Sequence, residues 1–247
     1  MRLQLMTWPQ VEKHVKVSKG VIIPAGSTEQ HGPTGPIGTD AICAESLAVG
    51  VGEAAGAVVA PTISYGMSVH HMRFPGSVTL RPTTLVHVMR DVILALAQHG
   101  FRRFFVLNGH GGNTASLNAA FFEAYTDAYD LIDDPRNLRC MVMQWWEAAS
   151  AERLSAELFG ERDGDHASAS EVSLAWHAYP DHVCSDAIQR DAPASGPVFG
   201  PSDFKKRYAV GGMGSDPTVA SVAQGATLHG AIVADLAKRY QEFLDEE

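Results

Sequence analysis

The segment Gly26–Asp40 reads GSTEQHGPTGPIGTD and places three side chains that can bind a metal in a loop rich in glycine and proline. Glu29 and His31 are two residues apart, so their side chains point the same way if the backbone is extended. Asp40 adds an oxygen ligand that can bridge two ions. The alternative interpretation is a surface loop in which Asp40 caps a helix that begins at Ala41.

A second stretch, NGHGGN at Asn108–Asn113, follows a predicted strand and precedes a predicted helix. It is not a phosphate-binding P-loop, because no lysine follows the glycines. His110 at the carboxyl end of a strand, in a backbone that can turn tightly, is well placed to bind a metal. The alternative interpretation is a tight turn with an exposed histidine.

The third stretch is DGDHASASEVS, and it contains His166 and Glu171. If His166 lies at the start of a helix, both side chains can face the same cleft. Asp163 and Asp165 then cap the helix or orient His166. The alternative interpretation is an ordinary capped helix start with exposed charges.

Together, the three stretches supply carboxylate and imidazole ligands, which suit Zn, Mn or Fe(II) better than Ca or Mg. Five ligands with one shared aspartate are enough for two adjacent ions, which can activate a water and hold a carbonyl oxygen at the same time. A further histidine can carry a proton to a leaving nitrogen. The set therefore predicts a metal-dependent hydrolase.

The elements that must position these residues alternate between strand and helix. Strand-like runs and helical periods follow one another, which predicts a mostly parallel sheet with both faces covered, in one α/β domain over residues 1–247. Ligands bind at the carboxyl ends of such strands, so the candidate loops should meet at one edge. The predicted strands are Gly20–Gly26, Ala57–Gly66, Arg102–Asn108 and Leu138–Trp146. The predicted helices are Thr83–Gly100, Thr114–Ile132, Glu147–Phe159, Ser168–Tyr179 and Val222–Leu244, with a long excursion at Ala187–Asp216.

Composition narrows the class of protein. The net charge of −9 argues against nucleic acid and anionic membranes as main partners. Cys43, Cys140 and Cys184 are widely spaced and are expected to be reduced thiols. The amino terminus lacks the apolar core of a signal peptide and no apolar run approaches the length of a membrane span, so we expect a cytoplasmic protein.

Five segments resemble, in order, the signature segments of the creatininase (creatinine amidohydrolase) family. They are PAGSTEQHGPTGPIGTD, YGMSVHHMRFPGS, NGHGGN, DHASASEVS and GGMGSDPTVASVAQG. The resemblance implies a three-layer α/β/α fold, a homo-oligomer that is often a hexamer, and two divalent ions, usually Zn or Mn and sometimes Fe. It also implies hydrolysis of the C–N bond of small molecules such as cyclic amides and formamides.

Position by position, the resemblance implies a role for each matching residue. Asp40 is implied to bridge the two ions, His166 to be the catalytic histidine, and Ser68 to contact substrate. The implied ligands are Glu29, Asp40 and His110 for one metal, and His31 and Asp40 for the other.

The chain departs from creatininase itself after the loop histidine. Gly111 and Gly112 stand where creatininase has an aromatic residue and a metal-binding glutamate, so Glu171 is our candidate for the missing carboxylate and for a catalytic role. Arg162 stands where creatininase has a tryptophan that covers the substrate, and it could select a carboxylate or phosphate. Asp163 keeps the acidic match at this substrate-binding segment.

The sequence leaves open the roles of two residue pairs, one of tryptophans and one of histidines. Trp145 and Trp146 end a predicted strand, and one of them either lines the pocket or packs in the core. His70 and His71 replace the usual Glu-His pair, and the sequence assigns His70 no role.

The leading hypothesis is thus an amidohydrolase with two metal ions acting on a small cyclic amide. The alternatives are a formamide deformylase or a peptidase of the same family, with an anionic or modified-peptide substrate. A metal-bound protein without catalytic activity is the remaining alternative. A purely structural ion, however, needs neither the spare histidine nor an open coordination position.

Overall fold

The computed structural model describes residues 1–184 and 190–246. Four parallel strands form its sheet in the order β2-β1-β3-β4. β1 spans Gly20–Ala25, β2 Val58–Val59, β3 Arg103–Asn108 and β4 Arg139–Gln144. The strand expected at Ala57–Gly66 is only two residues long, because Pro61 has no N–H to donate and the chain leaves the sheet there. One isolated bridge, from Ile63 to Ala25, continues the pairing.

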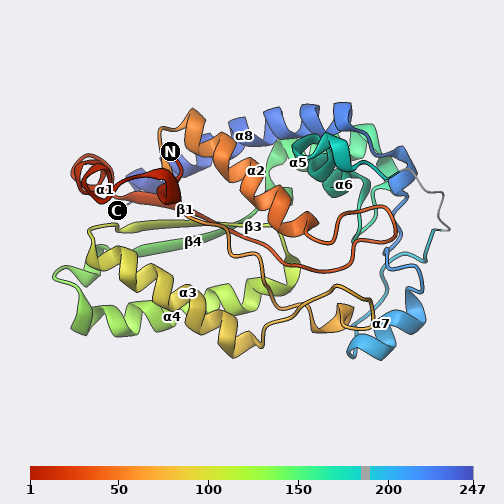
Figure 1. Ribbon diagram of the computed structural model, residues 1–247, viewed down its shortest axis with the longest axis horizontal. Helices are drawn as coiled ribbons and strands as arrows, with labels where there is room; N and C mark the ends of the chain where they lie inside the picture. The colour runs from red at the N-terminus through yellow and green to blue at the C-terminus, as the bar shows by residue number, and fades with distance from the viewer. Residues whose placement is uncertain (185–189, 247) are drawn as a thin grey trace.

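Helices cover both faces of this sheet, as Figure 1 shows. α2, α5, α6 and α8 lie over one face, and α3 and α4 cover the other. The predicted three-layer α/β/α architecture is confirmed. The bounds are Thr39–Ala54 for α2, Pro82–Gln98 for α3, Thr114–Leu131 for α4, Ala149–Leu158 for α5, Ala169–Ala178 for α6 and Val222–Asp245 for α8.

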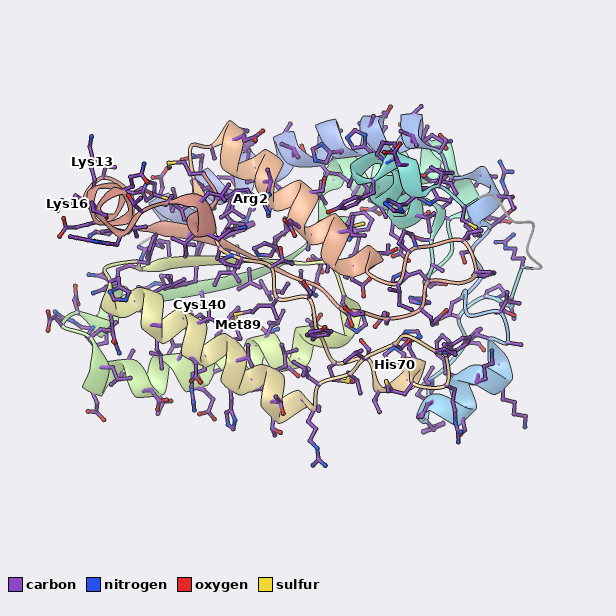
Figure 2. All side chains as sticks on the ribbon, viewed as in Figure 1. Arg2, Lys13, Lys16, His70, Met89 and Cys140 are labelled. Atoms are coloured by element: carbon purple, nitrogen blue, oxygen red, sulfur yellow. The ribbon has the colours of Figure 1, made fainter. Side chains whose placement is uncertain are left out.

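Alternate residues of each strand enter opposite layers of the core, as the period of two requires. Ile22 and Phe105 pack in the layer under α2 and α8, while Ile23 packs in the layer of α3 and α4. Met89 of α3 and Cys140 of β4 belong to this second layer (Figure 2). Burial of each large aliphatic side chain contributes roughly 1.5–3 kcal/mol, so the sheet is a rigid base for the loops at its ends.

The helix boundaries agree with the sequence patterns at most positions. Gly100 follows α3 with φ of 104°, the left-handed conformation expected of a glycine just after a helix. Asp40 is the exception, because α2 begins at Thr39 with Gly38 as its N-cap, so Asp40 lies in the first turn and does not cap the helix. Its carboxylate is therefore free for other contacts.

Two helices were not predicted. α1 (Trp8–Val15) precedes the sheet, and α7 (Pro201–Arg207) lies within the long excursion at residues 187–216. The start of that excursion, residues 187–189, lies outside the described residues, as do residues 185 and 186 before it. No helix of the described residues is long and apolar enough to cross a membrane.

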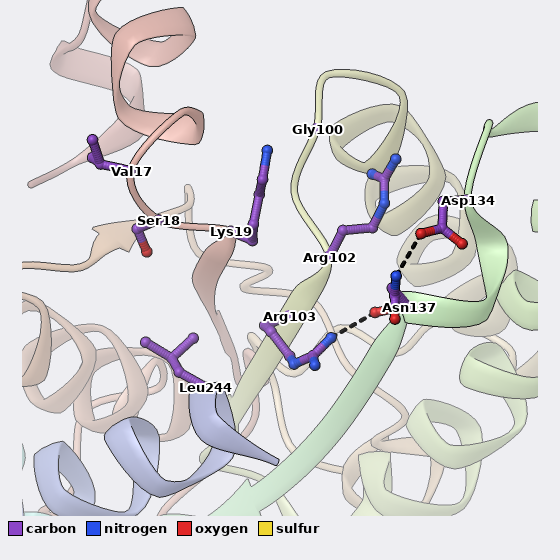
Figure 3. A pocket seen from close by; sticks show the side chains of 9 residues that line it. All are labelled: Val17, Ser18, Lys19, Gly100, Arg102, Arg103, Asp134, Asn137 and Leu244. Carbon is purple, nitrogen blue, oxygen red and sulfur yellow. Dashed lines mark hydrogen bonds between the residues drawn. The ribbon is translucent and has the colours of Figure 1, made fainter. Parts of the chain in front are cut away.

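Cavities lie at both ends of the sheet. The one at the amino ends of the strands, about 540 Å³, is lined by basic side chains that include Lys19, Arg102 and Arg103 (Figure 3). The carboxyl ends carry the loops that the sequence singled out. These loops build the candidate site.

Candidate active site

Glu29 and Asp40 lie at the centre of the carboxyl-end site. The loop after β1 folds back on itself, since the Glu29 N–H donates to the Ile37 carbonyl at 2.8 Å. Glu29 is 0% exposed and Asp40 is 4% exposed. Two carboxylates so deeply buried require compensating cations or hydrogen bonds.

His31 approaches Asp40 from the same loop. Its Nδ1 lies 3.1 Å from the Glu29 carbonyl oxygen, which can only accept, so Nδ1 carries the proton. The other nitrogen, Nε2, faces Asp40 Oδ1 at 3.0 Å. A histidine whose outer N–H donates to a backbone carbonyl is oriented as metal-ligating histidines usually are.

His110 reaches the same carboxylates from the turn after β3 and is oriented in the same way. Its Nε2 lies 3.0 Å from the Met67 carbonyl oxygen, which leaves Nδ1 facing Asp40 Oδ2 at 3.2 Å. Nε2 is also 3.3 Å from Glu29 Oε2. Asp40 thus lies between the two histidines, with one oxygen toward each.

The surroundings of Gly112, two residues after His110, leave no room for a side chain at that position. A Cβ at Gly112 would lie 2.4 Å from His110 Nε2 and 2.5 Å from the Met67 carbonyl oxygen. A glutamate there would therefore displace His110 or the Met67 backbone. Any further carboxylate beside His110 would therefore belong to another element.

Glu171 places a carboxylate beside the cluster from the first turn of α6. Its Oε1 lies 3.5 Å from His31 Nε2, and it also accepts a hydrogen bond from the Ser168 N–H at 2.9 Å. Glu171 therefore closes a capping box at the start of α6 and faces the buried cluster. The capping role that the sequence left open for this segment is confirmed, but Glu171 is not an exposed charge.

His166 comes from the turn just before α6. Ala167, the next residue, is in the left-handed region with φ of 52°, a conformation that is costly for a non-glycine residue and common at functional sites. His166 Nε2 lies 2.9 Å from the Gln30 carbonyl oxygen, and Nδ1 lies 3.8 Å from Glu29 Oε1. His166 thereby presents Nδ1 to the carboxylates.

Three carboxylate oxygens in the site have no hydrogen-bond partner among the described residues. They are both oxygens of Glu29 and Oδ2 of Asp40. Buried polar atoms of folded proteins are almost always satisfied, so each such oxygen needs an explanation. Buried carboxylate oxygens that accept no hydrogen bond suit a cation. Three groups of side chains have ligand atoms within 4.8 Å of one another: Glu29, His31 and Asp40; His31, His166 and Glu171; and Glu29, His71 and His166.

The electrostatics of the two oriented histidines agree with this fit. Burial disfavours the charged imidazole of His31, but Asp40 and Glu171 outweigh it and raise its pKa to about 10. Burial likewise opposes the charge on His110, but Glu29 and Asp40 raise its pKa to about 9. In the metal-free protein, protons on these rings would balance the carboxylates. A divalent ion would take the place of those protons.

In the two remaining groups, burial outweighs the nearby charges and favours the neutral form. Burial, followed by the charges of His71 and His31, lowers the pKa of His166 well below its usual value. Burial raises the pKa of Glu171 to about 7, with His31 opposing the rise. A neutral His166 beside the carboxylates can accept a proton at Nδ1.

A cavity of about 460 Å³ opens onto this cluster. Asp40, His110, His166 and Glu171 all line it. Its walls come from the turn after β4, from α5 and from the loop before α6, and they include Trp145, Trp146, Glu152, Ser155 and Asp165.

The structure places the four expected substrate residues differently. Trp145 lines the cavity although it is 3% exposed and also packs in the core, while Trp146 at its edge is 37% exposed. Asp163 lines the cavity, but its carboxylate accepts from the Ser170 N–H at 2.7 Å and so satisfies a backbone donor in the first turn of α6. Ser68 is fully buried beneath His110, with its Oγ 3.4 Å from Nε2.

Arg162 is not brought to the cavity. It belongs to the short 3₁₀ turn Gly160–Arg162 on the surface, and its side chain is exposed. The cavity lining near it is acidic, with Asp163 and Asp165. The expectation that Arg162 selects an anionic substrate therefore finds no geometric basis.

Sequence reasoning missed Gln30 and His71, which are both buried in this site. His71 Nε2 lies 3.1 Å from Glu29 Oε1, and Gln30 contacts both His71 and His166. Burial, followed by the charges of His70 and His31, lowers the pKa of His71 to about 2, so the ring is neutral. His70, beside it on the α7 side of the molecule (Figure 2), stacks on His110. The position of Gln30 between two candidate ligands in the sequence, Glu29 and His31, was the available signal.

Comparison with known proteins identifies the family of this chain. The family model described as creatininase, creatinine amidohydrolase, matches residues 4–240. The chain belongs to the creatininase family. It is 28% identical to creatinine amidohydrolase of Pseudomonas putida over 96% of this chain and 95% of that protein. It is 31% identical to the mycofactocin precursor peptide peptidase of Mycolicibacterium smegmatis, over 90% of this chain and 85% of that protein.

Solved creatininase structures share the fold. One described as creatininase Mn superposes with a TM-score of 0.88 at 27% identity and covers 99% of both chains. A mutant creatininase of Zn-Zn type gives a TM-score of 0.87 at 26% identity, over 99% of this chain and 98% of that chain. Metal binding by these creatininases agrees with the cluster of histidine and carboxylate ligands found here.

Proposed function

We propose that this member of the creatininase family is a metal-dependent amidohydrolase that binds two divalent ions, Zn or Mn. The ligands would be Glu29, His31, Asp40, His110 and Glu171, with Asp40 shared. The observation that carries the proposal is the set of buried carboxylate oxygens without hydrogen-bond partners, faced by histidine nitrogens whose outer N–H groups donate to backbone carbonyls. When bound, the ions would supply Lewis acidity, which lowers the pKa of a water molecule and polarises an amide carbonyl.

The chain's own residues would then carry the protons. His166 lines the cavity and turns Nδ1 toward Glu29, while its Nε2 is held by the Gln30 carbonyl. Because burial keeps the ring neutral, Nδ1 can accept the proton of the attacking water and return it to the departing nitrogen. The indole rings of Trp145 and Trp146 would exclude water from one wall.

Substrate choice follows from the same cavity. The wall carries Glu152 and Asp165, and the lining includes no lysine or arginine in the described part of the chain. This favours a neutral or amine-bearing substrate over an anionic formamide. A small cyclic amide fits within about 460 Å³.

A peptide substrate is the second candidate. A neighbouring cavity of about 630 Å³ shares Gly164 and Asp165 with the first and extends toward Arg190 and Asp191. An extended substrate would occupy both. The likeness to the mycofactocin precursor peptide peptidase favours the same reading.

The test is hydrolysis before and after metal removal. Protein stripped with a chelator and then reloaded with Zn or Mn would be offered creatinine, N-formyl amines and short peptides, with products identified by mass spectrometry. We expect hydrolysis of at least one class by the reloaded protein only. Equal activity of the stripped protein would contradict the proposal.

A further inference from the structure

The NGHGGN turn contains two asparagines, Asn108 and Asn113, that have no role in the proposed metal centre. Both are 0% exposed, and neither of them lines the cavity at this end of the sheet. Buried amide groups of folded proteins are almost always paired by hydrogen bonds. The partners of these two side chains therefore indicate what they do.

The Asn113 side chain joins three loops at the carboxyl end of the sheet. Its Oδ1 accepts from the Met67 N–H at 2.9 Å, and its Nδ2 donates to the Gly26 carbonyl at 3.0 Å. Nδ2 also donates to Asn108 Oδ1 at 3.2 Å. The Met67 N–H can only donate and the Gly26 carbonyl can only accept, so these two partners fix the orientation of the Asn113 amide.

Two of the three loops hold His110. The Met67 carbonyl oxygen lies 3.0 Å from His110 Nε2. The Asn108 side chain contacts the His110 backbone twice, because its Oδ1 accepts from the His110 N–H at 3.2 Å and its Nδ2 donates to the His110 carbonyl at 2.6 Å. Asn113 therefore supports both the backbone of His110 and the carbonyl against which its ring lies.

The third loop, which begins at Gly26, has supports of its own. The Gly35 N–H donates to the His31 carbonyl at 3.0 Å, and the His31 ring lies against the Glu29 carbonyl. These contacts do not involve Asn113. The effect of Asn113 on the site should therefore be concentrated at the histidine of the NGHGGN turn.

Two glycines leave the Asn113 amide the space that this contact needs. A Cβ at Gly66 would lie 2.4 Å from Asn113 Oδ1 and 2.7 Å from the Gly26 carbonyl oxygen. A Cβ at Gly112 would lie 2.5 Å from the Met67 carbonyl oxygen. A side chain at either position would separate the segments that Asn113 joins.

We propose that Asn113 is a positioning residue for His110. Together with Asn108, it holds the His110 backbone and the Met67 carbonyl in one fixed arrangement, so that the His110 ring faces the buried carboxylates. The inference rests on the proposed metal centre, in which His110 would bind one ion and His31 the other. Loss of the Asn113 amide should therefore weaken only the ion on His110.

The experiment measures zinc affinity by competition with a chromophoric chelator for wild type and Asn113→Leu. Leucine has nearly the shape of asparagine but can form none of its hydrogen bonds. We expect the affinity for one ion to fall roughly 10- to 100-fold, the usual cost of losing a group that orients a ligand. The affinity for the other ion should stay at the wild-type value. Asn113→Ala provides the same test if circular dichroism shows that the leucine variant is unfolded.

Ile93→Ala is the matched control for a general loss of stability. Ile93 is a fully buried residue of α3, in the core layer of α3 and α4, so its truncation opens a cavity and destabilises the fold. We expect this variant to bind both ions as wild type does. Weakening of zinc binding in Ile93→Ala to the same degree as in Asn113→Leu would make the effect of Asn113 one of stability alone and would overturn the proposal.

Combining Asn113→Leu with His110→Ala tests whether Asn113 acts through His110. If it does, the ion that remains in His110→Ala should bind equally with and without Asn113→Leu. Further weakening of that ion would overturn the proposal, and so would unchanged affinity for both ions in Asn113→Leu alone. A wild-type protein that binds no zinc would instead overturn the proposed function, and this inference with it.

Discussion

Each end of the sheet has a cavity beside charged side chains, but the two ends differ in whether these charged groups find hydrogen-bond partners in the protein. At the amino end, Arg102 donates to the Ala97 and Phe101 carbonyls at 2.6 and 2.7 Å. Arg103 donates to two further carbonyls. Of the nitrogens of these two guanidinium groups, only Arg103 Nε is buried without a hydrogen-bond partner among the described residues. Lys19 is exposed to solvent.

At the carboxyl end, Asp40 lines the smaller cavity, and Glu29 and Asp40 together hold three buried carboxylate oxygens without hydrogen-bond partners among the described residues. Cavity size therefore does not identify the site. What distinguishes the carboxyl end is charge that the fold buries and leaves unsatisfied, which costs stability unless a ligand compensates it. The amino end, in contrast, already satisfies most of its donors with its own backbone.

The largest effect at the carboxyl end is expected from a substitution of Asp40. Asp40→Asn keeps the size of the side chain but removes the charge that faces both His31 and His110. We expect metal content to fall from about two ions per chain to fewer than about one, because the site then lacks its shared ligand. Elemental analysis after dialysis against Zn gives the number. Full metal content would refute the shared role of Asp40.

His166 should separate chemistry from metal binding. His166→Ala removes Nδ1 from the cavity while leaving the five proposed ligands, so we expect kcat to fall roughly 10²- to 10⁴-fold, as for a positioned acid–base group. Metal content should stay at the wild-type value. Both kcat and metal content should be measured on one preparation of the variant. Loss of metal together with loss of activity would make His166 a metal ligand.

Glu171 allows its two roles to be separated by a matched pair of variants. Glu171→Gln keeps an oxygen for the Ser168 N–H and loses the charge, whereas Glu171→Ala loses both. We expect both to bind fewer ions. Only the alanine variant should also lose about 0.5–2 kcal/mol of metal-free stability, the usual cost of a lost helix cap.

Urea unfolding of the metal-free proteins provides the stability values for this pair. Equal stability of the two variants would mean that the capping box at α6 contributes nothing measurable. Equal metal content to wild type in both would remove Glu171 from the ligands. The two roles are thus tested independently.

The smallest effect belongs to the amino end. Lys19→Met removes an exposed charge from the cavity of Figure 3, so we expect stability to change by less than about 0.5 kcal/mol. Metal content and hydrolysis should not change. A loss of either would show that the two ends of the sheet are coupled and would undo the comparison.

The sequence predicted the parts of the site whose chemistry is local. Glu29, His31 and His110 follow strands in glycine-rich loops, and the carboxyl ends of parallel strands meet, so their convergence could be expected. Glu171, expected to replace the carboxylate missing at Gly112, does lie beside His31, while its role as a ligand stays a prediction.

The sequence could not show contacts that depend on how distant segments pack. The pairing of Gln30 with His71 requires the Gly211 loop, far along the chain. Arg162 was expected in the cavity from its position near His166, but the direction of a side chain in a short surface turn is not set by sequence spacing. Asp40 looked like a helix cap because helix starts shift by one or two residues without changing the pattern.

The central claim is that the carboxyl end of the sheet holds two metal ions. The most direct measurement is the metal content per chain of wild-type protein purified without chelators and reloaded with Zn or Mn, with Lys19→Met as the matched control from the opposite end. We expect about two ions per chain in both proteins, held by five ligand residues, of which Asp40 binds both ions. No bound ion after reloading, or ions lost in the Lys19→Met variant, would contradict it.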